Sequence, residues 1–184
     1  QLWGWQNAET LLVAQRENTT FKISPGHNAH FALRVHRPGY HSPSQLEAEL
    51  EWLQHLGGQG LAVAVPVASS KGLLLEQLDG YQVSVLHWFD GQAMGQSRQP
   101  LQLQHGPQVF YALGQSMARL HQISDVWCGN TNLDRPRWDL DGLLGEQPLW
   151  GAFWQNPQLT DEQIKCLLEA RSRLRSDFIK WIPQ

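Results

Sequence analysis

The sequence predicts an α+β fold, in which an antiparallel sheet of five strands packs against one helix and is followed by a mainly helical region. Up to about residue 89, short runs of β-branched and aromatic residues between turn residues are typical of strands, and one segment between them has helical spacing. Near Asp90 the apolar period changes from 2 to 3.6 residues. The turns are short enough to connect antiparallel neighbours.

The first hairpin consists of residues 19–24 and 31–35, with Pro25 and Gly26 in the turn between them. A helix is expected next, with Ser44 as the N-cap and Glu47 completing a capping box. Its apolar residues recur at helical spacing and are Leu46, Leu50, Leu53 and Leu56. The pair Gly57 and Gly58 ends it.

A second hairpin is predicted for residues 72–78 and 81–88, because Asp79 and Gly80 form a strong tight-turn signal between them. A connector begins at Asp90, and residues 108–121 have the spacing of a helix. Residues 121–157 read as a long irregular stretch. A last helix is expected from Thr160, capped together with Gln163, to about residue 181.

Composition argues against several classes of protein. The net charge is -3, from 14 basic and 17 acidic residues, and no basic run is interleaved with aromatic residues, so we expect no nucleic-acid partner. No apolar stretch approaches the roughly 20 residues of a membrane span, so no membrane association is expected. Two cysteines, Cys128 and Cys166, are too few for a disulfide framework and favour the cytoplasm. The chain starts at Gln1, so we expect preceding residues in the gene product.

Nine tryptophans are many for 184 residues. They either belong to the core, which is the more common situation, or in part line a pocket that needs flat apolar surfaces with a polar N–H.

One carboxylate stands out in the first predicted helix. At 100° per residue, Glu49 projects into the same face as the leucines, whereas Glu47 and Glu51 point away from it. A carboxylate on an apolar face is costly unless it is paired, and the charged residue of the preceding strand is Arg34. The pair is either a structural ion pair or a means of positioning a phosphate-binding cation, and Glu49 could also lie at the exposed edge of the helix.

Several segments together resemble the aminoglycoside phosphotransferase and homoserine kinase type II-like group of enzymes, which have the protein-kinase-like fold. The segments that are similar are residues 17–21 (ENTTF), 31–40 (FALRVHRPGY), 49–53 (ELEWL), 88–91 (WFDG) and 113–121 (LGQSMARLH). Their order and spacing, rather than any single motif, make the resemblance. It implies an N-lobe for nucleotide binding at residues 1–91 and the start of a helical C-lobe at residues 92–184.

The resemblance also implies roles for individual residues. Those implied to bind nucleotide are Asn18, Thr19, Arg34, Glu49, His87, Trp88 and Phe89. Asn18 and Thr19 belong to the turn that covers the phosphates, and the backbone of residues 87–89 to the linker at the adenine edge. Arg34 stands at the position of the family's phosphate-binding lysine, and Glu49 at that of the glutamate that orients it. Arginine is a planar fork rather than a compact ammonium, so its contact with phosphate would be either bidentate or weaker. The side chain of His87 is more simply an ordinary strand histidine.

The family's catalytic loop and its magnesium ligands are expected after the last helix, beyond residue 184, so no catalytic or metal-binding residue is assigned within this chain. Two segments offer weak substitutes for that loop. His121 and Asp125 belong to a helix end. Asp139 and Asp141 resemble a metal pair, but Asp139 is more simply a helix cap or an arginine partner.

The sequence therefore predicts part of an ATP- and magnesium-dependent phosphotransferase that acts on a hydroxyl-bearing acceptor, either a small molecule or a protein. By itself this chain is expected to be inactive. The alternative is a non-catalytic nucleotide-binding or regulatory module of the same fold. The acceptor is not determined by the sequence. A dimer through Ile164, Leu168 and Phe178 is conceivable, because these apolar residues recur along the last helix.

Overall fold

The computed structural model describes residues 2–26, 28–91, 94–95, 98–127 and 135–181. The chain forms two compact units, Gln1–Asp134 and Arg135–Gln184. Cys128, considered above, lies outside the described residues. Among the described helices, none combines the length and apolar character needed to cross a membrane.

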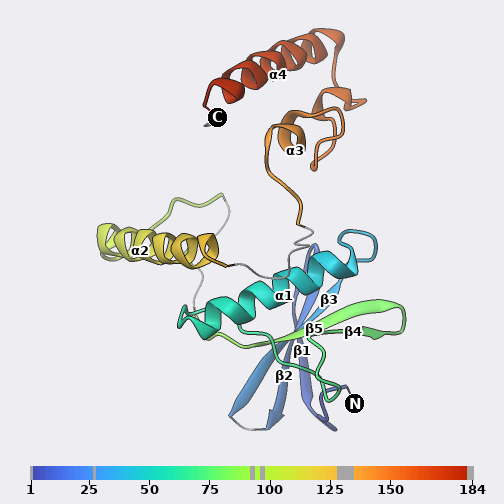
Figure 1. The fold of residues 1–184 in the computed structure, drawn as a ribbon, viewed down its shortest axis with the longest axis vertical. Helices are drawn as coiled ribbons and strands as arrows, with labels where there is room; N and C mark the ends of the chain where they lie inside the picture. The colour runs from blue at the N-terminus through green and yellow to red at the C-terminus, as the bar shows by residue number, and fades with distance from the viewer. Residues whose placement is uncertain (1, 27, 92–93, 96–97, 128–134, 182–184) are drawn as a thin grey trace. The chain divides into compact units, whose positions relative to one another are not determined.

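The first unit is built on one five-stranded sheet. Its strands are β1 (Glu9–Gln15), β2 (Asn18–Gly26), β3 (Ala29–His36), β4 (Leu75–Leu78) and β5 (Tyr81–His87). They lie in the order β1-β2-β3-β5-β4, and each neighbouring pair is antiparallel (Figure 1). The five-stranded antiparallel sheet is therefore confirmed. Sequence reasoning did not locate β1, and β4 begins three residues later than expected.

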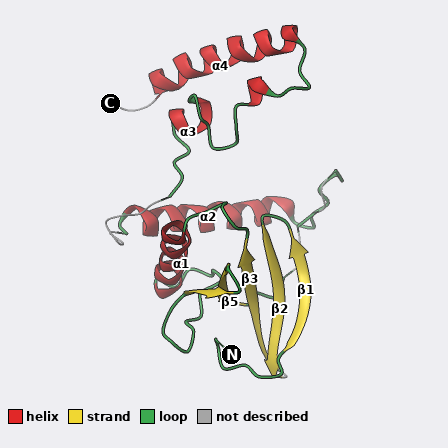
Figure 2. Cartoon of the chain, turned by 90° about the vertical axis from the view of Figure 1, so that its right-hand side faces the viewer, coloured by secondary structure: helices red, strands yellow, loops and turns green. Residues whose placement is uncertain are grey.

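The helix α1 (Pro43–Gly58) lies between β3 and β4 in sequence and packs beside the sheet (Figure 2). Its N-cap is Ser42, whose side chain accepts from Gln45 N while the Gln45 side chain accepts from Ser42 N. The predicted box of Ser44 and Glu47 is therefore wrong by two residues, because Pro43 suits the first helical position and sets the start. The buried residues of α1 are Leu46, Ala48, Leu50 and Leu56.

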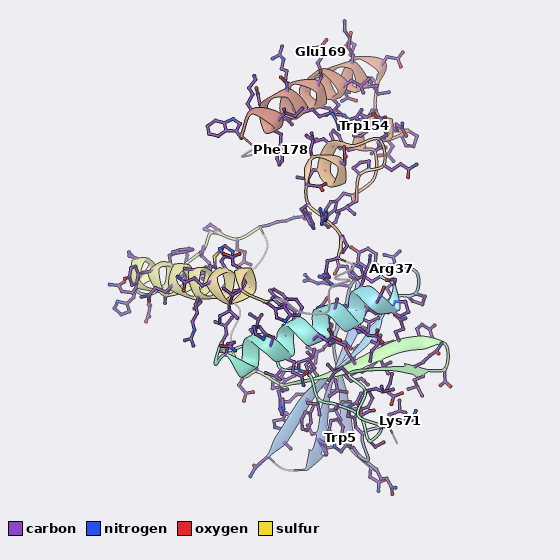
Figure 3. All side chains as sticks on the ribbon, viewed as in Figure 1. Trp5, Arg37, Lys71, Trp154, Glu169 and Phe178 are labelled. Atoms are coloured by element: carbon purple, nitrogen blue, oxygen red, sulfur yellow. The ribbon has the colours of Figure 1, made fainter. Side chains whose placement is uncertain are left out.

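The two faces of the sheet have different environments. One face, with Ile23, Val83 and Val85, lines an apolar cavity of about 290 Å³ together with Trp3 and Trp5 of the N-terminal segment. Trp5 stacks on Phe31 with ring centroids 4.3 Å apart (Figure 3 labels Trp5). Opposite neighbours in the strands share a face, so the other face includes Thr20, Arg34 and Ser84.

The helix α2 (Gly106–Asp125) belongs to the first unit and contacts α1 through polar groups. Trp52 Nε1 donates to Ser124 Oγ at 3.1 Å, and Arg119 Nη2 donates to the Gln59 carbonyl at 3.0 Å. The predicted helix over residues 108–121 is confirmed and is longer than expected. No residue of α2 is buried.

The second unit contains α3 (Leu140–Leu144), the 3-10 helix η1 (Phe153–Gln155) and α4 (Asp161–Trp181). The expectation of a wholly irregular stretch before residue 157 is corrected by α3 and η1. Trp154, which is labelled in Figure 3, is buried. The Arg171 guanidinium lies 4.0 Å from its ring centroid. The predicted cap of α4 is present, since Thr160 N donates to Gln163 Oε1 and Gln163 N donates to Thr160 Oγ1.

Both interpretations of the tryptophans are right for some of them. Trp154 is a core residue, and Trp3 and Trp5 line the cavity behind the sheet. Others are largely exposed, namely Trp138, Trp150 and Trp181.

Candidate functional site

The candidate site is centred on Arg34 in β3. In the sheet register Arg34 lies opposite Thr20 of β2 and Ser84 of β5, so all three side chains are on one face. Arg34 Nη1 donates to Glu49 Oε1 of α1 at 2.8 Å, and both side chains are about one-fifth exposed, at 21% and 19%. The predicted contact between strand cation and helix carboxylate is therefore present.

The surroundings of Glu49 exclude one of the alternatives for this residue. It is half-buried and bonded, so it is not an exposed glutamate at the helix edge. Glu47 is exposed as predicted, whereas Glu51 is half-buried rather than fully on the solvated side. The helix therefore presents one carboxylate, that of Glu49, to Arg34. Of the five N–H groups of Arg34, one donates to Glu49 and one to Asn18, as described next, which leaves three others.

Asn18, at the start of β2, contacts the same guanidinium. With its amide oriented to satisfy both groups, its oxygen accepts from Arg34 Nη2 at 3.0 Å and its nitrogen donates to the Glu17 carbonyl at 3.2 Å. Thr19 lies opposite Val35, so its side chain is on the other face of the sheet and is not brought together with Arg34. Of these two predicted residues, only Asn18 joins the site through its side chain.

Sequence reasoning missed a buried polar pair next to Arg34. His36 is 4% exposed and Ser84 is fully buried, and His36 Nε2 and Ser84 Oγ are 2.9 Å apart. Burial, assisted by the Arg34 guanidinium, lowers the pKa of His36 to about 4, so the imidazole is neutral at pH 7. The spacing in the sequence could have indicated this position of His36. Residues two apart in a strand share a face, and His36 follows Arg34 by two residues.

The linker residues are divided between the two faces of the sheet. The His87 ring contacts Phe31, with centroids 5.5 Å apart, on the face opposite Arg34, in agreement with an ordinary strand histidine. The backbone N–H of His87 donates to the Val65 carbonyl at 2.9 Å, and that of Trp88 donates to the His30 carbonyl at 3.2 Å. Among the described residues Phe89 N–H makes no such bond, so it is the linker donor open to a ligand.

Trp88 lies on the Arg34 side of the sheet together with a residue that the sequence did not indicate. Lys22 Nζ is 4.9 Å from the Trp88 ring centroid, and Lys22 is opposite Ala32 in the register. Ala32 in turn lies opposite Leu86. Leu86 is buried, so this face offers an aromatic ring, the small apolar side chain of Ala32 and two cations, Lys22 and Arg34. This set is suitable for a flat base joined to anionic groups.

Two carboxylates of the second unit that could suggest a metal pair, Asp139 and Asp141, have protein partners instead. Asp139 is the N-cap of α3, and its side chain accepts from Gly142 N at 2.9 Å, as the simpler interpretation predicted. Asp141 lies 3.8 Å from Arg175. Within the part of the chain that the structure describes, no group of three or more His, Cys, Asp or Glu side chains could hold a metal ion.

Known proteins are similar over most of this chain. The model of the phosphotransferase enzyme family matches residues 10–182. An uncharacterized protein of Deinococcus radiodurans is 28% identical over 150 residues, which are 79% of this chain and 40% of that protein. Amicoumacin kinase of Bacillus subtilis is 26% identical over 144 residues, covering 77% of this chain and 42% of the kinase. The chain therefore spans about two-fifths of the length of these relatives.

Solved structures have the same fold. A microcompartment-associated aminopropanol kinase is similar with a TM-score of 0.78 and 27% identity, over 100% of this chain and 56% of the other. An amicoumacin kinase in complex with AMP-PNP, Ca2+ and Ami is similar with a TM-score of 0.74 over 100% and 52%, at 17% identity, which shows the fold alone. The sheet, the helix with its ion pair and the family match agree, and this chain belongs to the phosphotransferase enzyme family.

Proposed function

We propose that residues 1–91 form the nucleotide-binding lobe, and residues 92–184 the start of the C-lobe, of an ATP-dependent enzyme that phosphorylates a hydroxyl group of a small molecule or a protein. The observation that supports this most is the Arg34–Glu49 contact of 2.8 Å between the sheet and α1. A cation held by a helix carboxylate at this place is how kinase folds present a phosphate-binding group.

The residues present fit a bound ATP molecule. Lys22 and Arg34 supply positive charge for the phosphates, and Arg34 can form a planar fork to phosphate oxygens with its remaining N–H groups. Ala32 and the Trp88 ring supply apolar surface for a base. Phe89 N–H, which bonds to no described backbone carbonyl, can donate to the base edge. Trp88 and Phe89 of the predicted linker are therefore retained as binding residues, and His87 only through its backbone.

The residues of this chain hold and orient the ligand rather than make or break bonds. Bound ATP supplies the phosphoryl group, and phosphoryl transfer depends mostly on positioning and charge neutralisation. Glu49 keeps Arg34 directed at the phosphates and compensates part of its charge. We expect the group that accepts the acceptor's proton, and the ligands of magnesium, in the part of a longer protein that corresponds to the uncovered length of the relatives.

Calorimetric titration of ATP and magnesium into the 184-residue chain tests the proposal. Arg34→Ala is expected to weaken ATP binding about tenfold or more, because charge-assisted bonds to phosphate are lost. Arg37→Ala removes an exposed arginine just after β3 and serves as the matched control, with little change expected. No ATP binding by the unmodified chain, or equal losses for both variants, would contradict the nucleotide site.

Transfer of labelled phosphate from ATP to any alcohol should be undetectable with this chain. Transfer that is abolished by Arg34→Ala would show that the catalytic group lies within these residues. ATP binding without transfer by the longest natural form of the protein would instead support the non-catalytic module.

The dimer through Ile164, Leu168 and Phe178 stays a prediction. Leu168 and Phe178 are 41% and 36% exposed on α4, so an apolar contact between copies could form there. Sedimentation of the unmodified chain and of Leu168→Glu at increasing concentration would detect such a dimer and its loss.

A further inference from the structure

We propose that Asn18 is a positioning residue that fixes the Arg34 guanidinium to the turn between β1 and β2, so that this turn and the Arg34–Glu49 pair meet the phosphates of a nucleotide as one unit. The proposal rests on the proposed function, because it concerns the same site. It changes the expected role of Asn18 from direct phosphate contact to control of the cation.

The register of the sheet brings Asn18 to Arg34. Asn18 lies opposite His36 in the β2–β3 ladder, and Thr20 lies opposite Arg34. Asn18 is therefore the diagonal neighbour of Arg34 on the same face, a separation that long side chains can span. A slip of one residue would place Asn18 on the other face and remove the contact.

Two elements hold the guanidinium through different nitrogens. Nη1 donates to Glu49 of α1 at 2.8 Å, and Nη2 donates to Asn18 of β2 at 3.0 Å. One bond would leave the planar group free to rotate about its chain, whereas two acceptors on separate nitrogens fix its plane. The remaining N–H groups are then held in a defined direction before any ligand binds.

The same residue also secures the turn. The Asn18 amide nitrogen donates to the Glu17 carbonyl at 3.2 Å, and the Asn18 backbone carbonyl accepts from Arg16 N at 3.0 Å. The turn backbone and the Arg34 side chain are thus connected through one asparagine. Movement of the turn, which the family resemblance implies to cover the phosphates, would then change the direction of Arg34.

This arrangement is matched to arginine. A lysine at position 34 would present a single ammonium nitrogen, which cannot give separate nitrogens to Glu49 and Asn18. The contribution of Asn18 to phosphate binding should therefore depend on Arg34 and largely disappear when residue 34 is lysine.

The experiment measures binding of two probes, ATP with magnesium and adenosine, to the 184-residue chain by NMR titration or calorimetry. Asn18→Ala is expected to weaken ATP binding about fivefold to tenfold and adenosine binding less than about twofold, since only the phosphates are affected. In an Arg34→Lys background, Asn18→Ala should add less than about a twofold loss, because an ammonium has three equivalent donors on one nitrogen and no plane for Asn18 to fix. Asn28→Ala, an exposed asparagine at the other end of the hairpin, is the matched control.

The outcomes separate this proposal from the proposed function. If the unmodified chain binds ATP but Asn18→Ala weakens ATP and adenosine equally, Asn18 does not act through Arg34. The same conclusion follows if Asn18→Ala weakens ATP binding as strongly in the Arg34→Lys background as in the unmodified chain. If the unmodified chain binds neither probe, the nucleotide site itself is wrong and the positioning role falls with it. A loss confined to ATP and to the chain that retains Arg34 supports the proposal.

Discussion

The helices α1 and α4 are both amphipathic, yet the apolar face of α1 is buried and that of α4 is largely exposed. In α1 four residues are buried, and Leu50 is 1% exposed. In α4 no described residue is buried, and Leu174, Ile179 and Trp181 are 54%, 61% and 85% exposed. The carboxylates of the two ion pairs follow the same division, since Glu49 of α1 is 19% exposed while Glu146, which pairs with Arg171 of α4, is 86% exposed.

This difference shows that helical periodicity predicts which residues form an apolar face, but not whether other residues bury that face. In the first unit, α1 packs against a sheet that is near it in sequence. The sheet contributes buried apolar side chains and the cation Arg34, which pairs with Glu49. The large buried apolar residues described in the second unit are Leu144 and Trp154, and α4 bonds to the Leu144 carbonyl through Arg171 and Arg175. The stability of the first unit should therefore depend mainly on burial of apolar side chains. The stability of the second unit should depend more on interactions within its helices and on exposed contacts.

The largest expected effect comes from shortening matched leucines. Leu50→Ala should lower the free energy of unfolding of the first unit by about 2–5 kcal/mol, because it removes a fully buried side chain and leaves a cavity. Leu174→Ala removes the same atoms from an exposed position and should cost less than about 0.5 kcal/mol. Urea unfolding followed by hydrogen exchange of each unit measures both. Similar losses would show that the α4 face is covered in solution.

A smaller effect, confined to the first unit, is expected from pH. The pKa of His36 is lowered from 6.5 to about 4 by burial, so between these values the unfolded chain binds a proton that the folded chain does not. The free energy of unfolding should therefore fall as pH falls, by about 2 kcal/mol between pH 7 and pH 5.

All histidines of the chain precede residue 135, so the second unit serves as an internal control for this pH dependence. Residues 135–184 contain no histidine, so exchange protection in α4 should lack this pH dependence. His36→Gln should flatten the pH profile of the first unit, and His121→Gln, changed at an exposed site, controls for the loss of one imidazole. A profile that is unchanged by His36→Gln would contradict the burial of a neutral imidazole beside Arg34.

The smallest effect compares two ion pairs. Glu49→Ala should cost about 1–2 kcal/mol, because it leaves Arg34 half-buried with one partner fewer. Glu146→Ala should have little effect, since Glu146 is exposed and Arg171 keeps its bond to the Leu144 carbonyl and its contact with Trp154. Glu47→Ala is a second exposed control within α1. Equal unfolding midpoints for Glu49→Ala and Glu146→Ala in urea would show that the Arg34 pair contributes nothing to stability.

Local signals in the sequence predicted the parts of the fold that depend on neighbours in sequence. Asp79 and Gly80 mark the β4–β5 turn, Thr160 and Gln163 cap α4, and Asp139 caps α3, all as the structure shows. Where two local choices were similar, the sequence did not decide between them. Ser42 and Ser44 both suit an N-cap, and Pro43 at the first helical position selected Ser42.

The strand β1 was not located because its sequence has no alternating pattern. Its sequence, ETLLVAQ, has four apolar residues in a row rather than the alternation of apolar and polar side chains on which strand prediction depends, and six of its seven residues are exposed. Five strands were expected, but only four were located, at residues 19–24, 31–35, 72–78 and 81–88. Pairing with β2 from Glu9 to Gln15 holds this edge strand in place.

The sequence alone predicted that Glu49 and Arg34 meet, because a carboxylate on the leucine face of a helix requires a partner and the adjoining strand contains one arginine, and the structure shows this contact. It also determined the order of hairpin, helix and hairpin. Only the tertiary structure decided that Asn18 rather than Thr19 reaches Arg34, that His87 faces away from it, and that His36 and Ser84 are buried together. These facts depend on strand register, in which a shift of one residue reverses every side chain while leaving the sequence pattern almost unchanged.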